Sequence, residues 1–380
     1  MLAATIGMFT TMTLALGLLL AFTPYLMRRN ECFAVAVPGT AQKDPRIVAL
    51  KKRYATFMVG LTAAATILSL IAGTMIAHGG EQTDSAVAIA GSFAECAAVL
   101  ALVVASFVLM LRNRRKVMAL KQQEGWETAH AQTAAVVTEE DLPGPLPLAW
   151  NLLYVPVILG TLALGLALYP HMPDMLPMHA DFNGTVTRYE PKSLGTAIGF
   201  PVLLEVFLAA CFTFCQWMML RSKRPTDPAA PATSALAYGL FARAQSIFLL
   251  IIGILLGAGI GILFMLSSAG FIRLEQAGFI VIVLCVPIVI GIIALSVVYG
   301  QAGSRVFKRM QGDTPLLADD DEHWKLGVIY FNRDDASLFL PERFGIGWTM
   351  NLARPAAWAI IVGGVVLTAA FVIALVLIAG

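Results

Sequence analysis

Charged side chains are scarce in this sequence. Asp, Glu, Lys and Arg make up 13% of the 380 residues, whereas apolar residues make up 58% and the mean hydropathy is +0.77. A soluble domain carries about 25% charged residues. A water-soluble globular protein is therefore excluded, and we expect hydrocarbon to be the solvent for much of the chain.

Several chemical signatures are also missing. The five cysteines show no framework spacing, and Cys211 and Cys215, one helical turn apart, have no second pair to complete a metal site. The sequence contains no glycine-rich phosphate loop, no His-Glu-x-x-His motif, no nucleophile elbow and no Walker-type lysine. These absences argue against an ATP-driven or hydrolytic enzyme. We assign no catalytic residue and no cofactor, and we expect no nucleic-acid partner.

Eight apolar segments are long enough to cross a bilayer at about 20 residues each. The first is not a cleaved signal peptide, because no basic residue precedes its apolar run and Arg28 and Arg29 follow it directly. The chain is thus predicted to be an all-α polytopic membrane protein, with a small outer hairpin loop and a small cytoplasmic β-rich module. The predicted spans are 3–26, 55–77, 86–111, 150–169, 195–220, 246–268, 277–299 and 356–379.

The basic residues gather in alternate linkers. Of the 26 Lys and Arg residues, 23 fall in four segments and three fall in the other loops. By the positive-inside rule the four segments lie in the cytoplasm, so both termini are predicted to lie outside. Membrane lipids are the expected surroundings, and basic runs beside the spans can bind anionic lipids. The basic segments are 27–53, 112–149, 221–245 and 300–355, and the three exceptions are Arg188, Lys192 and Arg273.

The one substantial cytoplasmic piece is 301–355, which begins acidic and then becomes aromatic. We expect a strand over 325–332, a turn, and a second strand over 337–340. So small a hairpin is marginal alone, and we expect its aromatic residues to dock on the membrane face of the helices. A structural plug, an active site or a docking site for a cytoplasmic protein would each fit. The aromatic residues are Trp324, Tyr330, Phe331, Phe339 and Trp348.

The loop after the fourth span is a polar island between two apolar runs. Asn183-Gly184 is a strong signal for a two-residue β-turn, because both central positions of that turn need positive φ. The resulting hairpin would pair His179 with Arg188 and Ala180 with Thr187, and it would place Asp181 diagonal to Arg188.

Three hypotheses remain open for this loop. It can be a structural cap on the helices, a site for a ligand or peptide, or a metal site. The metal site would use His171, His179 and Asp181, although this spacing is not a recurrent zinc pattern. The candidate ligand-binding residues in the loop are His179, Asp181, Asn183, Gly184, Arg188, Tyr189 and Lys192.

Two carboxylates fall inside predicted spans, Glu95 in the third and Glu205 in the fifth. A charge at mid-bilayer costs roughly 3 kcal/mol or more unless it faces protein or water. Pro201 precedes Glu205 by one helical turn, so a kinked helix and a buried acid together predict a polar cavity. Glu95 can belong to the same outward-facing pocket. A protonated Glu205 bonded to a neighbouring helix is the alternative.

The segment LPMHADFNGTVTRYEPKS resembles the motif of the uncharacterised membrane domain that heads SdpI-like immunity proteins. The matching positions are Leu176, Pro177, His179, Asn183, Gly184, Tyr189 and Lys192. A second stretch, from the acidic run at 319 to Asn351, is similar to another uncharacterised domain that often lies downstream. The resemblance implies a multi-pass protein of a bacterial inner membrane. It also implies immunity to a secreted toxic peptide, with signalling through a repressor held at the membrane.

Three functions are therefore considered. The first is a protein that binds or senses an extracytoplasmic ligand or a secreted peptide. The second is a proton-coupled transporter of small solutes that uses Glu205 and Glu95. The third is a metal-dependent membrane enzyme. The expected domains are 1–149, with three spans; 150–220, the SdpI-like domain; 221–300, with two spans; 301–355, the cytoplasmic module; and 356–380, the last span.

Overall fold

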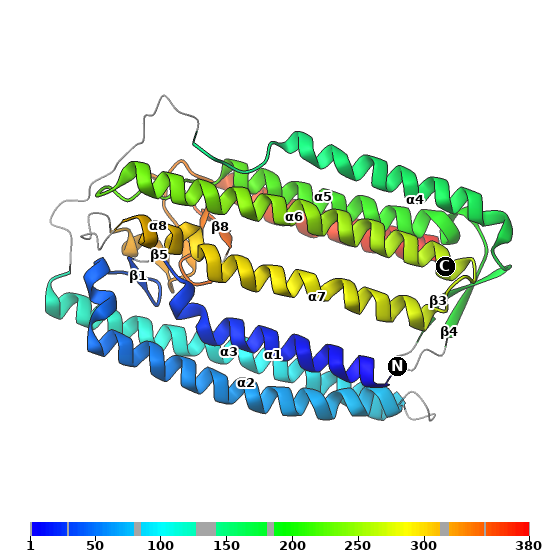
Figure 1. Cartoon of the computed structure of the whole chain (residues 1–380), viewed down its shortest axis with the longest axis horizontal. Coiled ribbons are helices and arrows are strands. Elements are labelled where there is room, and N and C mark those ends of the chain that lie inside the picture. Colours follow the sequence, from blue (N-terminus) through cyan, green and yellow to red (C-terminus); the bar gives the residue numbers. More distant parts are fainter. Residues whose placement is uncertain are drawn as a thin grey trace.

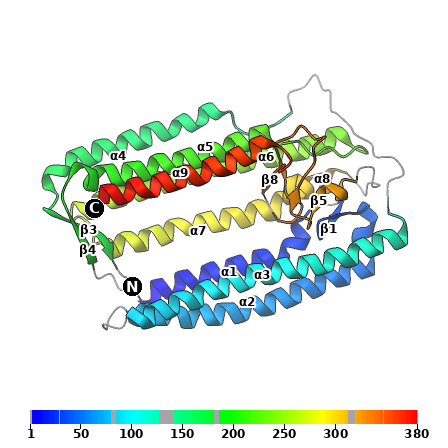
Figure 2. The ribbon, with the colours of Figure 1, turned by 180° about the vertical axis from the view of Figure 1, so that it is seen from behind.

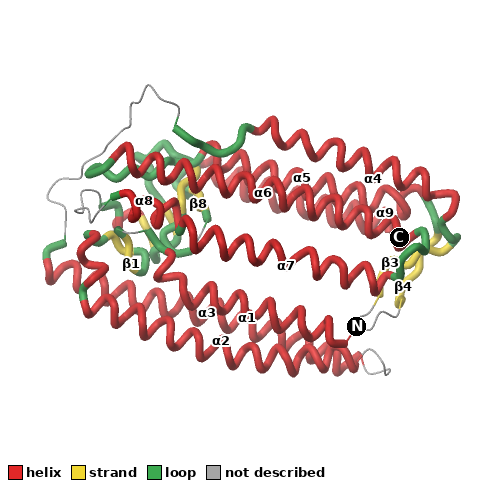
Figure 3. Tube along the Cα trace, viewed as in Figure 1, coloured by secondary structure: helices red, strands yellow, loops and turns green. Residues whose placement is uncertain are grey.

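The protein is a bundle of long helices with small β-sheets at both ends (Figures 1 and 3). The computed structural model describes residues 2–28, 30–79, 85–126, 142–180, 186–311, 319–345 and 347–379. Within them, eight helices are long and apolar enough to cross a membrane. The predicted all-α polytopic fold is thereby confirmed, and each predicted span lies on one of these helices. The domain boundaries stay predictions.

The first three long helices form an antiparallel N-terminal unit. They are α1 (Leu2–Leu26), α2 (Pro45–Gly79) and α3 (Ser85–Glu124). Tyr54 of α2 is buried at their contact, where its hydroxyl lies 2.7 Å from Ser106 Oγ of α3 and donates to the Leu20 carbonyl at 3.3 Å. Both α2 and α3 extend past their predicted spans, because the polar residues that flank the apolar runs are good helix formers.

The other five long helices form a second group. They are α4 (Tyr154–Leu168), α5 (Phe200–Arg221), α6 (Pro231–Ser268), α7 (Leu274–Tyr299) and α9 (Pro355–Ala379). In this group α4, α5 and α7 pack on α6, and α9 packs on α5. Phe207 of α5 stacks on Phe371 of α9 with ring centroids 3.9 Å apart. Seen from behind, α9 lies along α5, and α7 lies between this group and the N-terminal unit (Figure 2).

One hairpin lies at the end of the bundle where both chain ends also lie (Figure 1). It pairs β3 (Met175–Ala180) with β4 (Val186–Pro191) in antiparallel register. The predicted pairing of His179 with Arg188 is confirmed, whereas Ala180 pairs with Val186 instead of Thr187. The register of the pairing shifts on either side of His179. A shift of this kind leaves one residue without a pairing partner on the other strand. The predicted turn at Asn183-Gly184 lies outside the described residues.

The opposite end carries the module. It contains the short helix α8 (Ser304–Met310) and two hairpins, β5 (Trp324–Lys325) with β6 (Ile329–Tyr330) and β7 (Phe339–Pro341) with β8 (Trp348–Met350). The predicted pairing of a strand over 325–332 with one over 337–340 was wrong. Leu326 and Gly327 have φ of 54° and 76°, so the chain turns inside the predicted strand.

Docking of the module's aromatic residues on the helices is confirmed for Phe339, which is buried against α5, and for Trp348, which stacks on Phe241 of α6 with centroids 5.6 Å apart. Trp324 and Tyr330 are also buried, but they pack on each other within the module. Phe331 is 40% exposed, so the prediction was wrong for this residue. A further hairpin that the sequence did not predict, β1 (Glu31–Cys32) with β2 (Val35–Ala36), follows α1 and lies beside the module.

Candidate functional site

The β3–β4 hairpin presents a polar, exposed face. His179 Nδ1 lies 2.6 Å from Thr187 Oγ1, and Arg188 donates to Glu190 Oε1 at 2.6 Å. Tyr189 is 53% exposed. The predicted diagonal between Arg188 and Asp181 involves a residue outside the described part of the chain, as do the predicted contributions of Asn183 and Gly184.

The base of the hairpin is fixed to the helices. Leu176 and Met172 are buried and pack with Met265 of α6. Lys192 donates to the Met172 carbonyl at 2.8 Å, and its ammonium lies 5.2 Å from the centre of the Tyr169 ring. Lys192 therefore connects the end of β4 to the end of α4, whereas His179 and Arg188 lie farther along the hairpin, toward its turn.

The metal hypothesis gains no geometric support from the described residues, among which no group of three or more His, Cys, Asp or Glu could hold a metal ion. The His179 ring is engaged with Thr187. Asp181, the third proposed ligand, lies outside the described residues, so the set of His171, His179 and Asp181 stays a prediction.

Glu205 lies at the contact of α4, α5 and α6. Its side chain is 2% exposed, and its Oε1 accepts a hydrogen bond of 2.7 Å from Thr161 Oγ1 of α4. A Cβ at Gly261 of α6 would overlap Oε1, so the glycine makes room for the carboxyl group. The helix before it is irregular, with a π-helical turn over Gly195–Gly199 and Pro201 in the first turn of α5.

Glu95 has a similar environment in the other helix group. It is 8% exposed and accepts a hydrogen bond of 2.7 Å from Thr13 of α1. The structure thus places the two carboxyl groups at two different helix contacts, Glu95 between α3 and α1 and Glu205 between α5 and α4. It does not bring them together in a single contact, as a shared pocket would require.

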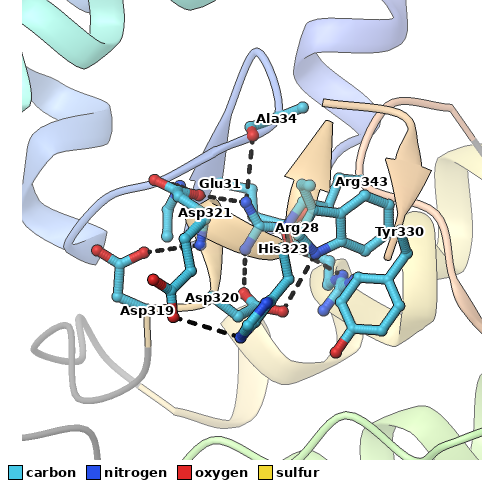
Figure 4. A network of polar contacts seen from close by, with 12 residues as sticks. Arg28, Glu31, Ala34, Asp319, Asp320, Asp321, His323, Tyr330 and Arg343 are labelled. Atoms are coloured by element: carbon cyan, nitrogen blue, oxygen red, sulfur yellow. Dashed lines mark hydrogen bonds and ion pairs between the residues drawn. The ribbon is translucent and has the colours of Figure 1, made fainter. Parts of the chain in front are cut away.

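The largest concentration of charge lies at the module end and was not predicted (Figure 4). Arg343, which is 2% exposed, forms ion pairs with Asp320 and Asp321 and lies 3.5 Å from Glu31 Oε1. Lys121 of α3 pairs with Asp319 and, at 2.6 Å, with Asp321. We call the following residues the Arg343 cluster: Arg28, Glu31, Arg114, Lys121, Asp319, Asp320, Asp321 and Arg343.

The Arg343 cluster contacts the strained turn between β1 and β2. Phe33 and Ala34, the two central residues of the β1–β2 turn, have φ of 47° and 60°, which non-glycine residues rarely adopt. The Ala34 carbonyl accepts hydrogen bonds from both Arg114 and Arg343, the latter at 3.2 Å. Two guanidinium groups thus hold the backbone of a turn that is costly by itself.

The carboxyl groups of the cluster differ in their titration. Burial is the largest single influence on Asp320 and Asp321 and opposes their ionisation. The Arg343 guanidinium, together with Trp324 and Arg28 for Asp320 and with Lys121 for Asp321, still lowers the pKa of both groups below its usual value. For Glu31 burial prevails and raises the pKa, although Arg28 and Arg343 lie within 3.5 Å. All three carboxyl groups favour the charged form of Arg343, and Asp320 does so most strongly.

Helix α5 meets the module on its other side. Trp217 of α5 packs edge to face on Phe339, with centroids 5.3 Å apart. Just past the helix, the Lys223 backbone donates to the Phe339 carbonyl at 2.8 Å, and its ammonium lies 2.6 Å from Asp335. Burial disfavours the charge on Asp335, yet the bond to Lys223 and other hydrogen bonds lower its pKa to about 2.

Sequence reasoning missed the Arg343 cluster because its members are far apart along the chain. One signal was available, since four consecutive acidic residues over 319–322 precede Arg343 in a region that is otherwise basic. An acidic run beside so many cations indicates internal pairing, but it does not say which cation is buried.

Two family models match the chain. One, described as a domain of unknown function (DUF1648), matches residues 157–204, which include most of α4, the hairpin and the start of α5. The other, described as a family of unknown function (DUF5808), matches residues 333–358 in the module and the start of α9. No curated protein and no solved structure matches. With its eight apolar helices, the chain is an integral membrane protein that carries two uncharacterised domains.

Proposed function

We propose that this protein is a membrane-embedded sensor, which binds an extracytoplasmic ligand or peptide at the β3–β4 hairpin and transmits binding through α5 to the module. The observation that carries the proposal is the position of α5. It begins a few residues after the hairpin and ends against Phe339 of the module. At 1.5 Å per residue, its 22 residues span about 33 Å.

The exposed face of the hairpin suits a peptide. Its described sheet has two strands, and most side chains of β4 are exposed, so an extended peptide can pair with the outer edge of β4. His179, Arg188 and Tyr189 would then offer cationic and aromatic contacts. Asp181, Asn183, Gly184 and Lys192 complete the proposed ligand-binding set.

The proposed location is the cytoplasmic membrane of a bacterium, with the hairpin and both termini outside. Two features support this orientation. The hairpin and the module lie at opposite ends of the bundle (Figure 1), and the basic linkers belong to the module end. The resemblance to SdpI-like immunity proteins favours a secreted peptide as the ligand and a cytoplasmic protein as the partner of 301–355.

Binding is tested with the protein in lipid nanodiscs. Secreted peptide fractions from the source cell are added, and the fraction that holds the ligand is expected to raise the midpoint of thermal unfolding. The double variant with His179→Ala and Asp181→Ala should abolish this shift. His323→Ala, in the module, is the control and should preserve it. A shift that survives in the double variant would show that the hairpin does not bind.

Transmission is tested without a natural ligand. A cysteine placed at Arg188, in a background without the exposed native cysteines, is coupled to biotin and loaded with streptavidin. We expect altered hydrogen exchange in β7 and β8 at the far end of the bundle. The control carries the cysteine at Phe271, which is 66% exposed in the turn between α6 and α7. Equal exchange in both loaded proteins would contradict transmission through α5.

Proton-coupled transport is the second candidate, and the burial of Glu205 between three helices favours it. Because Glu95 lies at a different helix contact, transport would depend on Glu205 as the carrier. Solute flux in proteoliposomes should then be lost in Glu205→Gln. Flux that this variant leaves intact would exclude the carrier role.

A further inference from the structure

One face of α6 is made of glycines where it meets α4 and α5. Gly253, Gly257 and Gly261 follow each other at intervals of four residues, and all three are buried. We call them the glycine face of α6. Residues at this spacing lie on one side of a helix, and three such positions extend over about 12 Å at 1.5 Å per residue.

Two polar side chains lie against this face without full hydrogen bonding. Glu205 lies against Gly261, and its Oε2 atom is buried with no hydrogen-bond partner among the described residues. Tyr154 lies against Gly253, and its hydroxyl is likewise buried and unpaired within the described part of the chain. A buried polar group without a partner costs about 1–3 kcal/mol. A purely structural contact between helices gains nothing from two such groups.

The contact contains no cation for the Glu205 carboxylate. The ionisable side chain of α4 is Tyr154, and those of α5, besides Glu205, are Cys211, Cys215 and the terminal Arg221. Helix α6 has no charged residue after Arg243, which lies before the glycine face, and α9 has no charged residue. The partner that the structure provides is the hydroxyl of Thr161.

A proton can join the carboxyl group without needing space of its own between the helices. We propose that Glu205 is a proton-binding site within the membrane, with Thr161 Oγ1 as the fixed donor to Oε1 and Oε2 as the atom that gains and releases the proton. A carboxylic acid is neutral, so the occupied site carries no charge in hydrocarbon. The proposal stands apart from sensing at the hairpin, since it requires neither a peptide nor the module.

The position of Glu205 on α5 means that loss of its proton would affect how this helix packs. Glu205 lies on α5 shortly after the π-helical turn over Gly195–Gly199, and turns of this kind are frequent at functional sites. Loss of the proton places a charge against the glycine face. The contact of α5 with α4 and α6 is weakened, and water or a change of helix position is then needed to solvate the carboxylate.

The test is infrared difference spectroscopy of the whole protein in lipid nanodiscs, titrated over a range of pH. The carbonyl-stretch band of protonated carboxylic acids should lose intensity as the pH rises, and Glu205→Gln should remove one component of this titrating band. Glu95→Gln is the matched control, because Glu95 is also buried and bonded to a threonine, and it should keep the component that Glu205→Gln removes.

A second variant protects the test against misfolding. Thr161→Val keeps the carboxyl group but removes its hydrogen bond, so the band should persist at a shifted frequency. A titrating band that is unchanged in Glu205→Gln would overturn the proposal, as would the lack of any such band in the native protein. Neither result bears on peptide binding, which the unfolding assay measures separately.

Discussion

Replacing Arg343 by methionine should release the module from the N-terminal helices. Methionine is apolar and of similar length, so it fills most of the volume of the arginine stem while removing the guanidinium. Asp320, Asp321 and Glu31 would then lose the cation they share. The Ala34 carbonyl would lose one of its two guanidinium donors.

The expected magnitude follows from burial. Removing one partner of a buried ion pair costs about 3–5 kcal/mol when the remaining charge is left without compensation. Here Lys121 still pairs with Asp321 and the Asp320 side chain is 51% exposed, so we expect a cost at the lower end of this range, about 3 kcal/mol. The contact of Arg343 with the Trp324 ring, at 5.1 Å from the centroid, adds about 0.5–2 kcal/mol. Since 1.4 kcal/mol corresponds to a tenfold change, the undocked population should rise by about two orders of magnitude or more.

The assay is amide hydrogen exchange of β7 and β8, which reports the free energy of local opening. Lys325→Met is the matched control, because it removes an exposed cation from the same module. Its ammonium contacts only the Glu322 carbonyl, at 3.0 Å, among the described hydrogen bonds. The control should change the opening free energy by less than about 0.5 kcal/mol.

The reasoning is refuted if Arg343→Met leaves the opening free energy within about 1 kcal/mol of the native value. A double variant with Asp321→Asn sharpens the result. If the two residues stabilise the module as a pair, the double variant should be less destabilised than the sum of the single variants.

Three further outcomes are expected. Because Asp321 has a pKa below its usual value in the folded protein, it stabilises the module above about pH 4, and hydrogen exchange should show this stability being lost as the pH falls further. Gly261→Ala should lower thermal stability by about 1–3 kcal/mol through overpacking. Gly257→Ala should cost less, because a Cβ at this position would lie 4.0 Å from its nearest neighbour, an atom of Val157. Equal losses of stability in the two variants would contradict the overpacking argument. Phe339→Ala should cost about 3–5 kcal/mol in an unfolding titration, because the ring is fully buried against α5; a loss below about 1 kcal/mol would mean that the module does not depend on it.

Local strand geometry was only partly predictable. The turn signal at Asn183-Gly184 predicted the pairing of His179 with Arg188, but the other described pairs of the hairpin, such as Ala180 with Val186, are one residue away from the register that a two-residue turn sets. The same reasoning failed in the module, where Leu326 takes a positive φ that a leucine rarely adopts. Tertiary contacts hold that turn: Gly327, the next residue, lies against Ala34 and Arg114 of the N-terminal unit.

The sequence by itself determined the membrane class, the eight spans and the unequal distribution of basic residues. Those properties are sums over neighbouring residues, and they need no knowledge of packing. Only the tertiary structure decided which helix faces meet. Glu205 bonds to Thr161, Glu95 bonds to Thr13, and Arg343 is buried among carboxylates that precede it in the chain. Helices that are apolar on every side have no stripe to mark the inward face, so their rotation is set by contacts with other helices.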